Sequence, residues 1–136
     1  MIVDANIVVH WFAVTEFSPT VVHFRDRNDL AAPAIILVEA ANVLYKNSRR
    51  GTIDPRHCGR SIRLLEYLLV DLVPDGHLLP LAIDLALAHT HPVYDCLYLA
   101  LALDRREPLA TADRRLAGLA QSLSIETTLI NPTATT

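Results

Sequence analysis

The sequence is poor in several residue types, and each shortage excludes a class of protein. Only two cysteines, Cys58 and Cys96, occur in 136 residues, too few for a disulfide framework or a cysteine-based zinc site. No apolar run approaches the roughly 18 uncharged residues of a membrane helix, and the first residues lack the basic segment and apolar core of a signal peptide. These absences predict a soluble, cytoplasmic protein with no membrane partner.

Positive charge is also scarce, and arginine carries almost all of it. Twelve basic residues against fifteen acidic ones give a formal net charge of −3, and Lys46 is the only lysine. Such a chain does not bind polyanions through bulk positive charge, so any contact with nucleic acid must be local. Arginine suits local contacts because its planar guanidinium pairs bidentately with phosphate or carboxylate.

Apolar residues, by contrast, are abundant. They make up 51% of the chain and charged residues 20%, which excludes disordered and low-complexity classes because those do not bury apolar surface. A chain of this length builds one core. The sequence therefore predicts a single domain over residues 1–130, followed by a loose tail at residues 131–136.

Short β-like runs alternate with longer helical segments along the chain. Strands are expected at residues 2–3, 30–32, 70–73, 108–111 and 127–130. Helices are expected at residues 6–12, 18–29, 34–47, 55–69, 81–89, 94–105 and 113–122, with the helix at 34–47 largely buried. This alternation predicts an α/β fold, a parallel sheet of short strands with helices on both faces. In such sheets, sites form beyond the carboxyl ends of the strands.

Four acidic residues stand singly within stretches that otherwise look buried: Asp4, Glu39, Asp95 and Asp113. An unpaired buried carboxylate is costly, and the nearby chain offers no cation for the first three. Asp4 ends the first strand and Asp113 follows a late one, so both side chains can point into one crevice at the strand ends. Oxygen ligands without cysteine suit a hard cation, Mg²⁺ or Mn²⁺, which implies phosphodiester chemistry.

Each of these acids also has a structural interpretation. Asp113 can be a first-turn helix acid that suits the helix dipole, Asp95 can serve the same role, and Asp4 can be a helix N-cap. Glu39, in mid-helix among apolar neighbours, is hardest to explain in this way. Two further acids with leucine neighbours are assigned to solvated helix faces: Glu66 and Asp84.

Four segments that contain these acids resemble the motifs of PIN-domain ribonucleases, and more narrowly of VapC-type toxins from toxin–antitoxin modules. They are residues 1–6 (MIVDAN), 33–44 (PAIILVEAANVL), 91–102 (HPVYDCLYLALA) and 109–116 (LATADRRL). The resemblance spans essentially the whole chain in the expected order. One mild departure is Cys96, which stands where a small residue such as alanine is more usual.

The resemblance implies a three-layer α/β/α fold and a Mg²⁺- or Mn²⁺-dependent endoribonuclease that serves as a toxin. Its metal-binding carboxylates would be Asp4, Glu39, Asp95 and Asp113. Asn6 and Thr111 match polar positions that hold ligands or waters, although Thr111 can equally be a helix cap. The sequence does not distinguish one ion from two. The partners implied are an RNA substrate, a cognate antitoxin protein and a second copy of the chain in a homodimer.

Arginines beside the last motif, Arg114 and Arg115, are possible RNA contacts, and ordinary surface residues are the alternative. The same two readings apply to Arg49 and Arg50.

Two other functions remain open at this stage. One is phosphotransfer through an aspartyl phosphate, which calls for a lysine near the phosphoryl group, whereas Lys46 lies near a predicted helix end. The other is a catalytically silent PIN-like module that binds RNA or regulates without cutting. Intact acids at all four motif positions argue against it.

Overall fold

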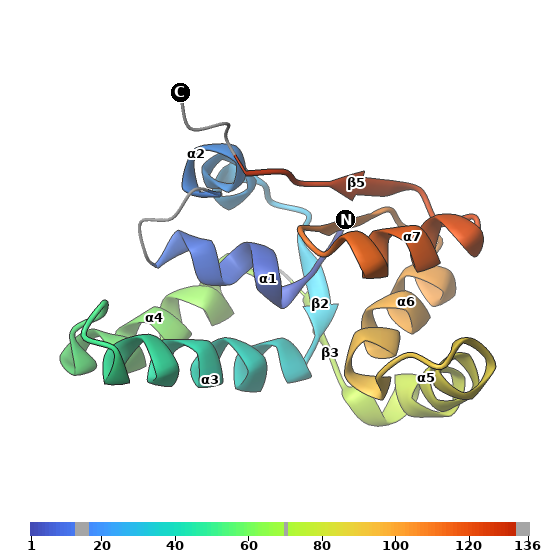
Figure 1. Ribbon diagram of the computed structural model, residues 1–136, viewed down its shortest axis with the longest axis horizontal. Helices are drawn as coiled ribbons and strands as arrows, with labels where there is room; N and C mark the ends of the chain where they lie inside the picture. Colours follow the sequence, from blue (N-terminus) through green and yellow to red (C-terminus); the bar gives the residue numbers. More distant parts are fainter. Residues whose placement is uncertain (13–16, 70, 133–136) are drawn as a thin grey trace.

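A sheet of five short parallel strands lies at the centre of the fold, in the order β3-β2-β1-β4-β5 (Figure 1). The structure is a computed structural model, and it describes residues 1–12, 17–69 and 71–132. The strands are β1 (Ile2–Val3), β2 (Ala31–Pro33), β3 (Asp71–Val73), β4 (Leu109–Thr111) and β5 (Thr127–Leu129). The helices are α1 (Ala5–Val8), α2 (Ser18–Val21), α3 (Ile35–Arg49), α4 (Pro55–Leu68), α5 (Asp75–His89), α6 (Val93–Arg105) and α7 (Arg114–Ser122), with the 3-10 helices η1 (Val9–Trp11) and η2 (Val22–Asp26).

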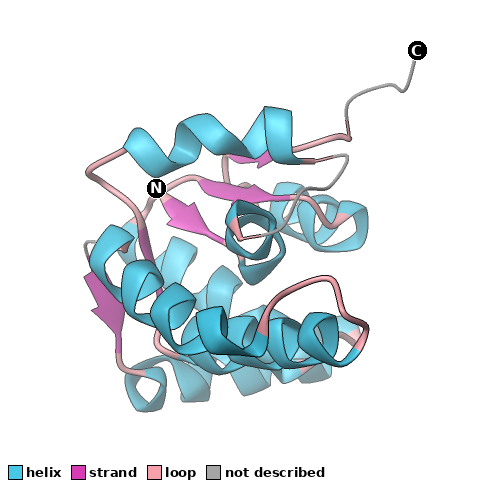
Figure 2. Cartoon of the chain, turned by 90° about the vertical axis from the view of Figure 1, so that its left-hand side faces the viewer, coloured by secondary structure: helices cyan, strands magenta, loops and turns pink. Residues whose placement is uncertain are grey.

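The strand order creates a switch point between β1 and β4. From β1 the chain moves outward through β2 to β3, then crosses back to β4 on the other side of β1. Because parallel crossovers are right-handed, α1 to α4 cover one face of the sheet and α5 to α7 the other. Figures 1 and 2 show these layers around the strands. The predicted α/β fold with a parallel sheet between helices is confirmed.

The core lies on both faces of the sheet, and α6 is its most deeply buried helix. Every residue from Cys96 to Ala102 is buried, as its apolar sequence predicts. One side of α6 contacts β1, β2 and β4, and α5 packs on α6. None of the helices in the described segments is long and apolar enough to cross a bilayer.

The start of α5 corrects the prediction of a helix over residues 81–89. The helix begins at Asp75, within a Pro-Asp-Gly stretch that reads as a turn, and it runs through Pro80. Proline removes one backbone donor, but Leu78, Ala82 and Leu85 bury their side chains at helical spacing. Tertiary packing therefore outweighs the local turn signal.

The exposure of α3 corrects a second prediction, that this helix is largely buried. Ile36, Ala40 and Leu44 are buried, whereas Val38 is 69% and Tyr45 is 62% exposed. Because α4, α1 and η1 cover only one side of α3, the nearly continuous apolar sequence leaves a second, solvent-facing side. An amphipathic sequence pattern would have indicated this division, and the pattern here is too apolar to do so.

Smaller differences affect the first helices. The helix predicted over residues 6–12 is α1 followed by η1, and the helix over 18–29 ends at Asp26 as α2 followed by η2. Predicted strand ends move by one residue, and Val70 lies outside the described residues. The loose tail stays a prediction because residues 133–136 also lie outside them.

Helix α4 presents a solvated stripe of arginines. Asp54 accepts a hydrogen bond from the Arg56 backbone N–H at 2.9 Å and so caps the helix, with Pro55 at its first position. Arg56, Arg60 and Arg63 are exposed. The two comparison acids, Glu66 and Asp84, are exposed as well, on α4 and α5.

Candidate active site

Asp4 lies at the carboxyl end of β1, directly at the switch point. Its backbone N–H donates to the Ala110 carbonyl at 3.1 Å, which fixes the residue against β4. Its side chain is 4% exposed, and Oδ2 accepts a 2.7 Å hydrogen bond from the hydroxyl of Thr111, at the end of β4. Thr111 Oγ1 also accepts from the Asp113 backbone N–H at 3.0 Å. Thr111 therefore joins Asp4 to the segment that carries Asp113.

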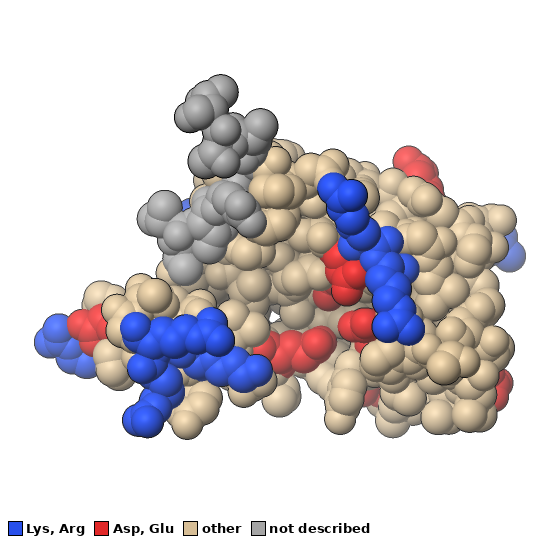
Figure 3. Space-filling model, viewed as in Figure 1, with Lys and Arg blue, Asp and Glu red and all other residues tan. Residues whose placement is uncertain are grey.

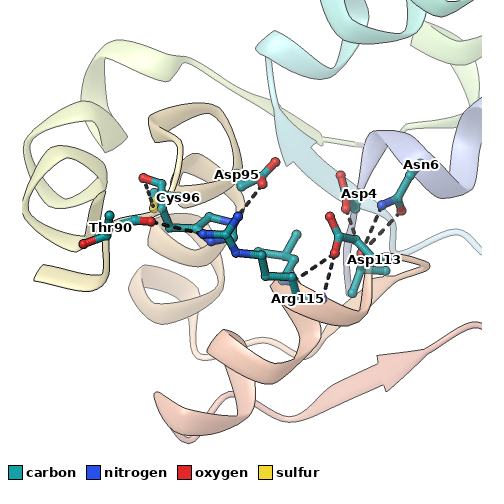
Figure 4. Close-up of polar contacts among 10 residues, drawn as sticks. Asp4, Asn6, Thr90, Asp95, Cys96, Asp113 and Arg115 are labelled. Carbon is teal, nitrogen blue, oxygen red and sulfur yellow. Dashed lines mark hydrogen bonds and ion pairs between the residues drawn. The ribbon is translucent and has the colours of Figure 1, made fainter. Parts of the chain in front are cut away.

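Asn6 ties the start of α1 to the same segment. Its Oδ1 accepts from the Ala112 backbone N–H at 3.0 Å, and its amide lies 3.4 Å from the Thr111 hydroxyl. Figure 4 shows Asp4, Asn6 and Asp113 together, with Asp95 on the neighbouring helix. Of the predicted supporting residues, Thr111 thus contacts Asp4 and the Asp113 backbone, and Asn6 contacts the same segment through Thr111 and Ala112.

Glu39 projects from α3 and is held by a side chain of α6. The Tyr98 hydroxyl donates to Glu39 Oε1 at 2.6 Å. Tyr98 is fully buried, and burial together with the carboxylates of Asp4 and Glu39 raises the pKa of its phenol well above the ordinary value. The phenol therefore keeps its proton and remains a donor to Glu39.

Asp95 lies in the first turn of α6, and His91, on the loop before this helix, contacts its side chain. His91 Nε2 is 2.8 Å from Asp95 Oδ2, and the His91 side chain is 4% exposed. The adjacent Cys96 is buried, and its thiol donates to the His91 carbonyl oxygen at an Sγ–O distance of 3.9 Å. Burial raises the pKa of the Cys96 thiol, so it stays protonated.

Three of the four predicted acids line one cavity. Asp4, Glu39 and Asp95 come from a strand end and two helices, and they border a space of ≈ 310 Å³ together with Asn6 and Asn42. Figure 3 shows acidic side chains gathered around a hollow on this face, with basic side chains on both sides. The structure therefore brings together residues that lie far apart in the sequence.

The electrostatics of the cavity are unfavourable for the ionised acids. Burial raises the pKa of Asp4 from 3.8 to about 7, with added repulsion from Asp95 and Glu39, although the Thr111 hydrogen bond opposes the rise. Burial also raises the pKa of Glu39, and Asp95 adds to that rise. Among the described residues, no cationic side chain forms an ion pair with Asp4 or Glu39.

This donor set fits a hard divalent cation. The acids supply oxygen ligands only, and their mutual repulsion favours a positive charge between them. Within the described residues, no three acidic, histidine or cysteine side chains converge closely enough to enclose an ion by themselves. Mg²⁺ does not require such a cage, since it keeps several waters and takes one or two carboxylates plus substrate phosphate oxygens.

Asp113 differs from the other acids because it caps a helix. Its Oδ1 accepts from the backbone N–H groups of Arg115, at 2.8 Å, and Leu116, at 3.2 Å, at the start of α7. This leaves Oδ2 without a described partner. The structural interpretation of Asp113 as a helix acid is thus satisfied, and its second oxygen is available for a further role.

Two substitutions separate the roles of Asp113. Asp113→Asn keeps an oxygen acceptor for the α7 cap, so we expect near-normal stability and at least a tenfold loss of metal-dependent RNA cleavage, on the order of a lost charge-assisted contact. Asp113→Ala should in addition lose about 1 kcal/mol of unfolding free energy. Urea unfolding and cleavage assays measure the two effects. Full cleavage by Asp113→Asn would leave Asp113 as a cap only.

The arginines beside this segment differ from one another. Arg115 donates from its guanidinium to the Thr90 carbonyl at 3.2 Å and so bridges α7 to the loop before α6, as Figure 4 shows. Arg114 is exposed, and no ion pair joins it to another described residue. Of the two predicted RNA contacts, Arg114 is therefore the one whose guanidinium has no described hydrogen bond within the protein.

A parallel α/β sheet with carboxylates clustered at its switch point is the framework of a cation and phosphate site. The chain belongs to the PIN domain family, whose model matches residues 1–121. PIN domains are generally nucleases that use divalent metal ions. The crystal structure of PAE2754 from Pyrobaculum aerophilum has a similar fold, with a TM-score of 0.66 and 22% identity over 93% of this chain and 81% of that chain. No curated protein gave a significant match.

Two residues at the site were missed by the sequence interpretation. Tyr98 looks like a core residue of an apolar helix, and His91 looks like one of several histidines without ligand spacing. The available signal was the polar group itself: a buried phenol or imidazole needs a hydrogen-bond partner, and the unpaired acids were the candidates.

The Tyr98 contact leads to an isosteric test. Tyr98→Phe removes one hydroxyl and leaves Glu39 without its donor, so we expect the Mn²⁺ affinity measured by calorimetry, and RNA cleavage with it, to fall about 10- to 100-fold. The unfolding free energy should fall by only about 1 kcal/mol. Tyr67→Phe is the matched control, because Tyr67 is 84% exposed on α4. Unchanged Mn²⁺ affinity in Tyr98→Phe would show that Tyr98 serves only in core packing.

Proposed function

We propose that the protein is a metal-dependent endoribonuclease that hydrolyses RNA phosphodiester bonds, with Mg²⁺ or Mn²⁺ as its cofactor. The observation that carries this proposal is the cavity lined by Asp4, Glu39 and Asp95, in which Asp4 and Glu39 have no cationic partner among the described residues. Membership of the PIN domain family supports the same reaction class.

The residues divide into ligands and supports. Asp4, Glu39, Asp95 and Asp113 would hold the cation, and Asn6 and Thr111 would orient Asp4 and the segment at the end of β4. A bound cation supplies Lewis-acid stabilisation of charge on the phosphate and lowers the pKa of a bound water. No side-chain nucleophile is needed for this hydrolysis.

The negative charge of the acids also determines the order in which the cation and the RNA bind. Ionised carboxylates repel phosphate, so the RNA backbone approaches favourably only after the negative charge of the cavity is balanced. Arg114, and Arg115 through the donors that Thr90 leaves free, would then bind phosphates beside the scissile bond.

The proposal extends to the biological role of a toxin in a type II toxin–antitoxin module, acting in the cytoplasm. A cognate antitoxin would cover the acidic cavity and suppress cleavage, with an arginine or lysine paired to the carboxylates. The chain would act as a homodimer. Leu79, Ile83 and Leu87, exposed at four-residue spacing on α5, are suited to such an interface, and sedimentation velocity tests for it.

The alternative is a PIN-like module that binds RNA or regulates without cutting. It predicts RNA binding that does not depend on divalent ions. The burial that raises the pKa of Asp4 would then destabilise the fold without serving any function. The retention of every acid, each supported by a specific hydrogen bond, favours the enzyme.

Cleavage of labelled RNA by the purified protein separates the two. We expect cuts in Mg²⁺ or Mn²⁺, none in EDTA, and near-normal rates for Glu66→Gln and Asp84→Asn, since both acids are exposed away from the cavity. RNA that stays intact at every divalent concentration would favour the silent module. Growth arrest on expression, relieved by co-expression of an antitoxin, tests the biological role.

A further inference from the structure

One side of α3 carries a polar stripe that leads away from the cavity. Its members are Glu39, Asn42, Lys46, Arg49 and Arg50, at the spacing i, i+3, i+7, i+10 and i+11. Residues at this spacing lie on one face of a helix, one above the other. Glu39 and Asn42 both line the cavity, so the stripe is continuous with it.

The far end of the stripe is a group of uncommitted cations. Lys46, Arg49 and Arg50 are exposed, and none of them forms an ion pair with another residue in the described ranges. Figure 3 shows basic side chains over this part of the molecule, on the opposite side of the acidic hollow from a second basic group. Cations in the last turn of a helix also interact favourably with the helix dipole. That interaction does not explain why polar residues connect these cations to the cavity.

The length of α3 sets the reach of these cations. At 1.5 Å per residue, Lys46 lies about 10 Å and Arg50 about 16 Å from Glu39 along the helix axis. Both distances exceed the Debye length of about 8 Å at physiological ionic strength, so the cations do little to offset the acids of the cavity through solvent. Their charge is instead available to a ligand that extends along the helix.

We propose that the Lys46–Arg49–Arg50 end of α3 binds backbone phosphates of a single-stranded RNA whose scissile phosphate lies at the acidic cavity. This inference rests on the proposed function. The strand would run from Arg114 on α7, across the cavity, and along the polar stripe of α3. Phosphates spaced along a chain match a row of cations that begins one or two helical turns from the site, and a single strand can follow a helix surface without the constraint of a duplex groove.

The test compares three RNAs and two charge-matched double variants. One RNA spans only the cut site, and each of the other two carries an extension on one side of it. Lys46→Gln with Arg49→Gln removes two stripe cations. Arg25→Gln with Arg106→Gln removes two exposed arginines that precede β2 and β4. They lie toward the amino ends of the strands, whereas the cavity lies at the carboxyl ends.

For the stripe variant we expect KM to rise about tenfold on the RNA extended toward α3 and much less on the short RNA. The slope of log KM against log salt should fall by about 0.7 for each cation removed. The value of kcat should hold, because these side chains do not reach the reacting phosphate. The control variant should match the wild type on all three RNAs.

Equal losses on short and extended RNA, or equal losses in both double variants, would overturn the inference. So would unchanged RNA kinetics together with weakened antitoxin binding, which would assign the stripe to an acidic protein segment. Fluorescence anisotropy of the extended RNA in EDTA separates this inference from the proposed function. RNA binding that depends on the polar stripe, without any metal-dependent cleavage, would contradict the proposed nuclease activity. It would still support the binding of RNA phosphates by the stripe.

Discussion

Replacement of Asp4 by asparagine is expected to lower metal-dependent RNA cleavage by about 10³-fold or more. A metal ion contributes several kcal/mol of transition-state stabilisation, and each 1.36 kcal/mol or so is a factor of ten in rate. Asparagine keeps the size of the side chain and an oxygen that accepts the Thr111 hydrogen bond, so the loss reports on charge. Asp84→Asn is the matched control on an exposed face.

The same substitution should change the pH dependence of stability. Burial raises the pKa of Asp4 to about 7, so between about pH 4 and pH 7 the folded, metal-free protein retains a proton that the unfolded chain has released. The unfolding free energy of the wild type therefore falls as the pH rises through this window, by up to about 4 kcal/mol. In EDTA, Asp4→Asn should show a shallower fall, with the remainder due to the raised pKa of Glu39.

Urea unfolding at pH 5 and pH 8 in EDTA measures this difference. Asp4→Asn should be the more stable protein at pH 8, and the difference in unfolding free energy should be clearly smaller at pH 5. If Asp4→Asn cleaves RNA at the wild-type rate, or is markedly less stable than the wild type at pH 8, then Asp4 is a structural strand-end residue and not a ligand.

Divalent ions are expected to raise the melting temperature of the wild-type protein by about 10 °C at a concentration of 100 times Kd. A ligand that binds only the folded state adds RT ln(1 + [L]/Kd), which is about 2.7 kcal/mol at that ratio. For a chain of this size, 1 kcal/mol corresponds to roughly 4 °C. The stabilisation arises because the cation replaces mutual repulsion among the carboxylates with attraction.

Sodium chloride at matched ionic strength is the control for screening. It should reproduce only a small part of the shift, and Asp4→Asn should lose most of the shift in Mn²⁺. A melting temperature that responds equally to Mn²⁺ and to sodium chloride would mean that the acids of the cavity do not form a specific cation site.

The sequence was sufficient to predict the parallel α/β fold and the positions of the acids at strand ends. Alternating short apolar runs and helices indicate the parallel sheet, whereas its strand order and switch point are seen only in the structure. Glu39 stood out because a carboxylate in an apolar helix needs a reason, and the structure supplies one in the cavity that Glu39 shares with Asp4 and Asp95.

The partners of the acids could not be predicted in the same way. The contact between Tyr98 and Glu39 joins residues 59 positions apart and depends on how α3 and α6 pack across the end of the sheet. The pair of His91 and Asp95 is local, but it requires the loop before α6 to turn the imidazole inward. Both contacts are consequences of tertiary packing. The periodicity of apolar residues along the sequence carries no information about such packing.

Errors in the elements had similar physical causes. The first turn of α5 was missed because Pro74, Asp75 and Gly76 are strong local turn formers. In the folded chain, Asp75 Oδ1 instead accepts from the Ile35 backbone N–H at 3.1 Å and caps α3 from outside. The exposed side of α3 was missed because its apolar residues are nearly continuous, and the cations of the polar stripe lie on that same helix.

The most direct test of the central claim, that these carboxylates hold the catalytic cation, is anomalous scattering from crystals grown with Mn²⁺. A manganese peak is expected in the cavity, within about 2.0–2.3 Å of carboxylate oxygens of Asp4 and at least one of Glu39, Asp95 and Asp113. In crystals of Asp4→Asn the peak should be weak or absent. A clear absence of manganese from the wild-type cavity, at a concentration that supports RNA cleavage, would contradict the claim.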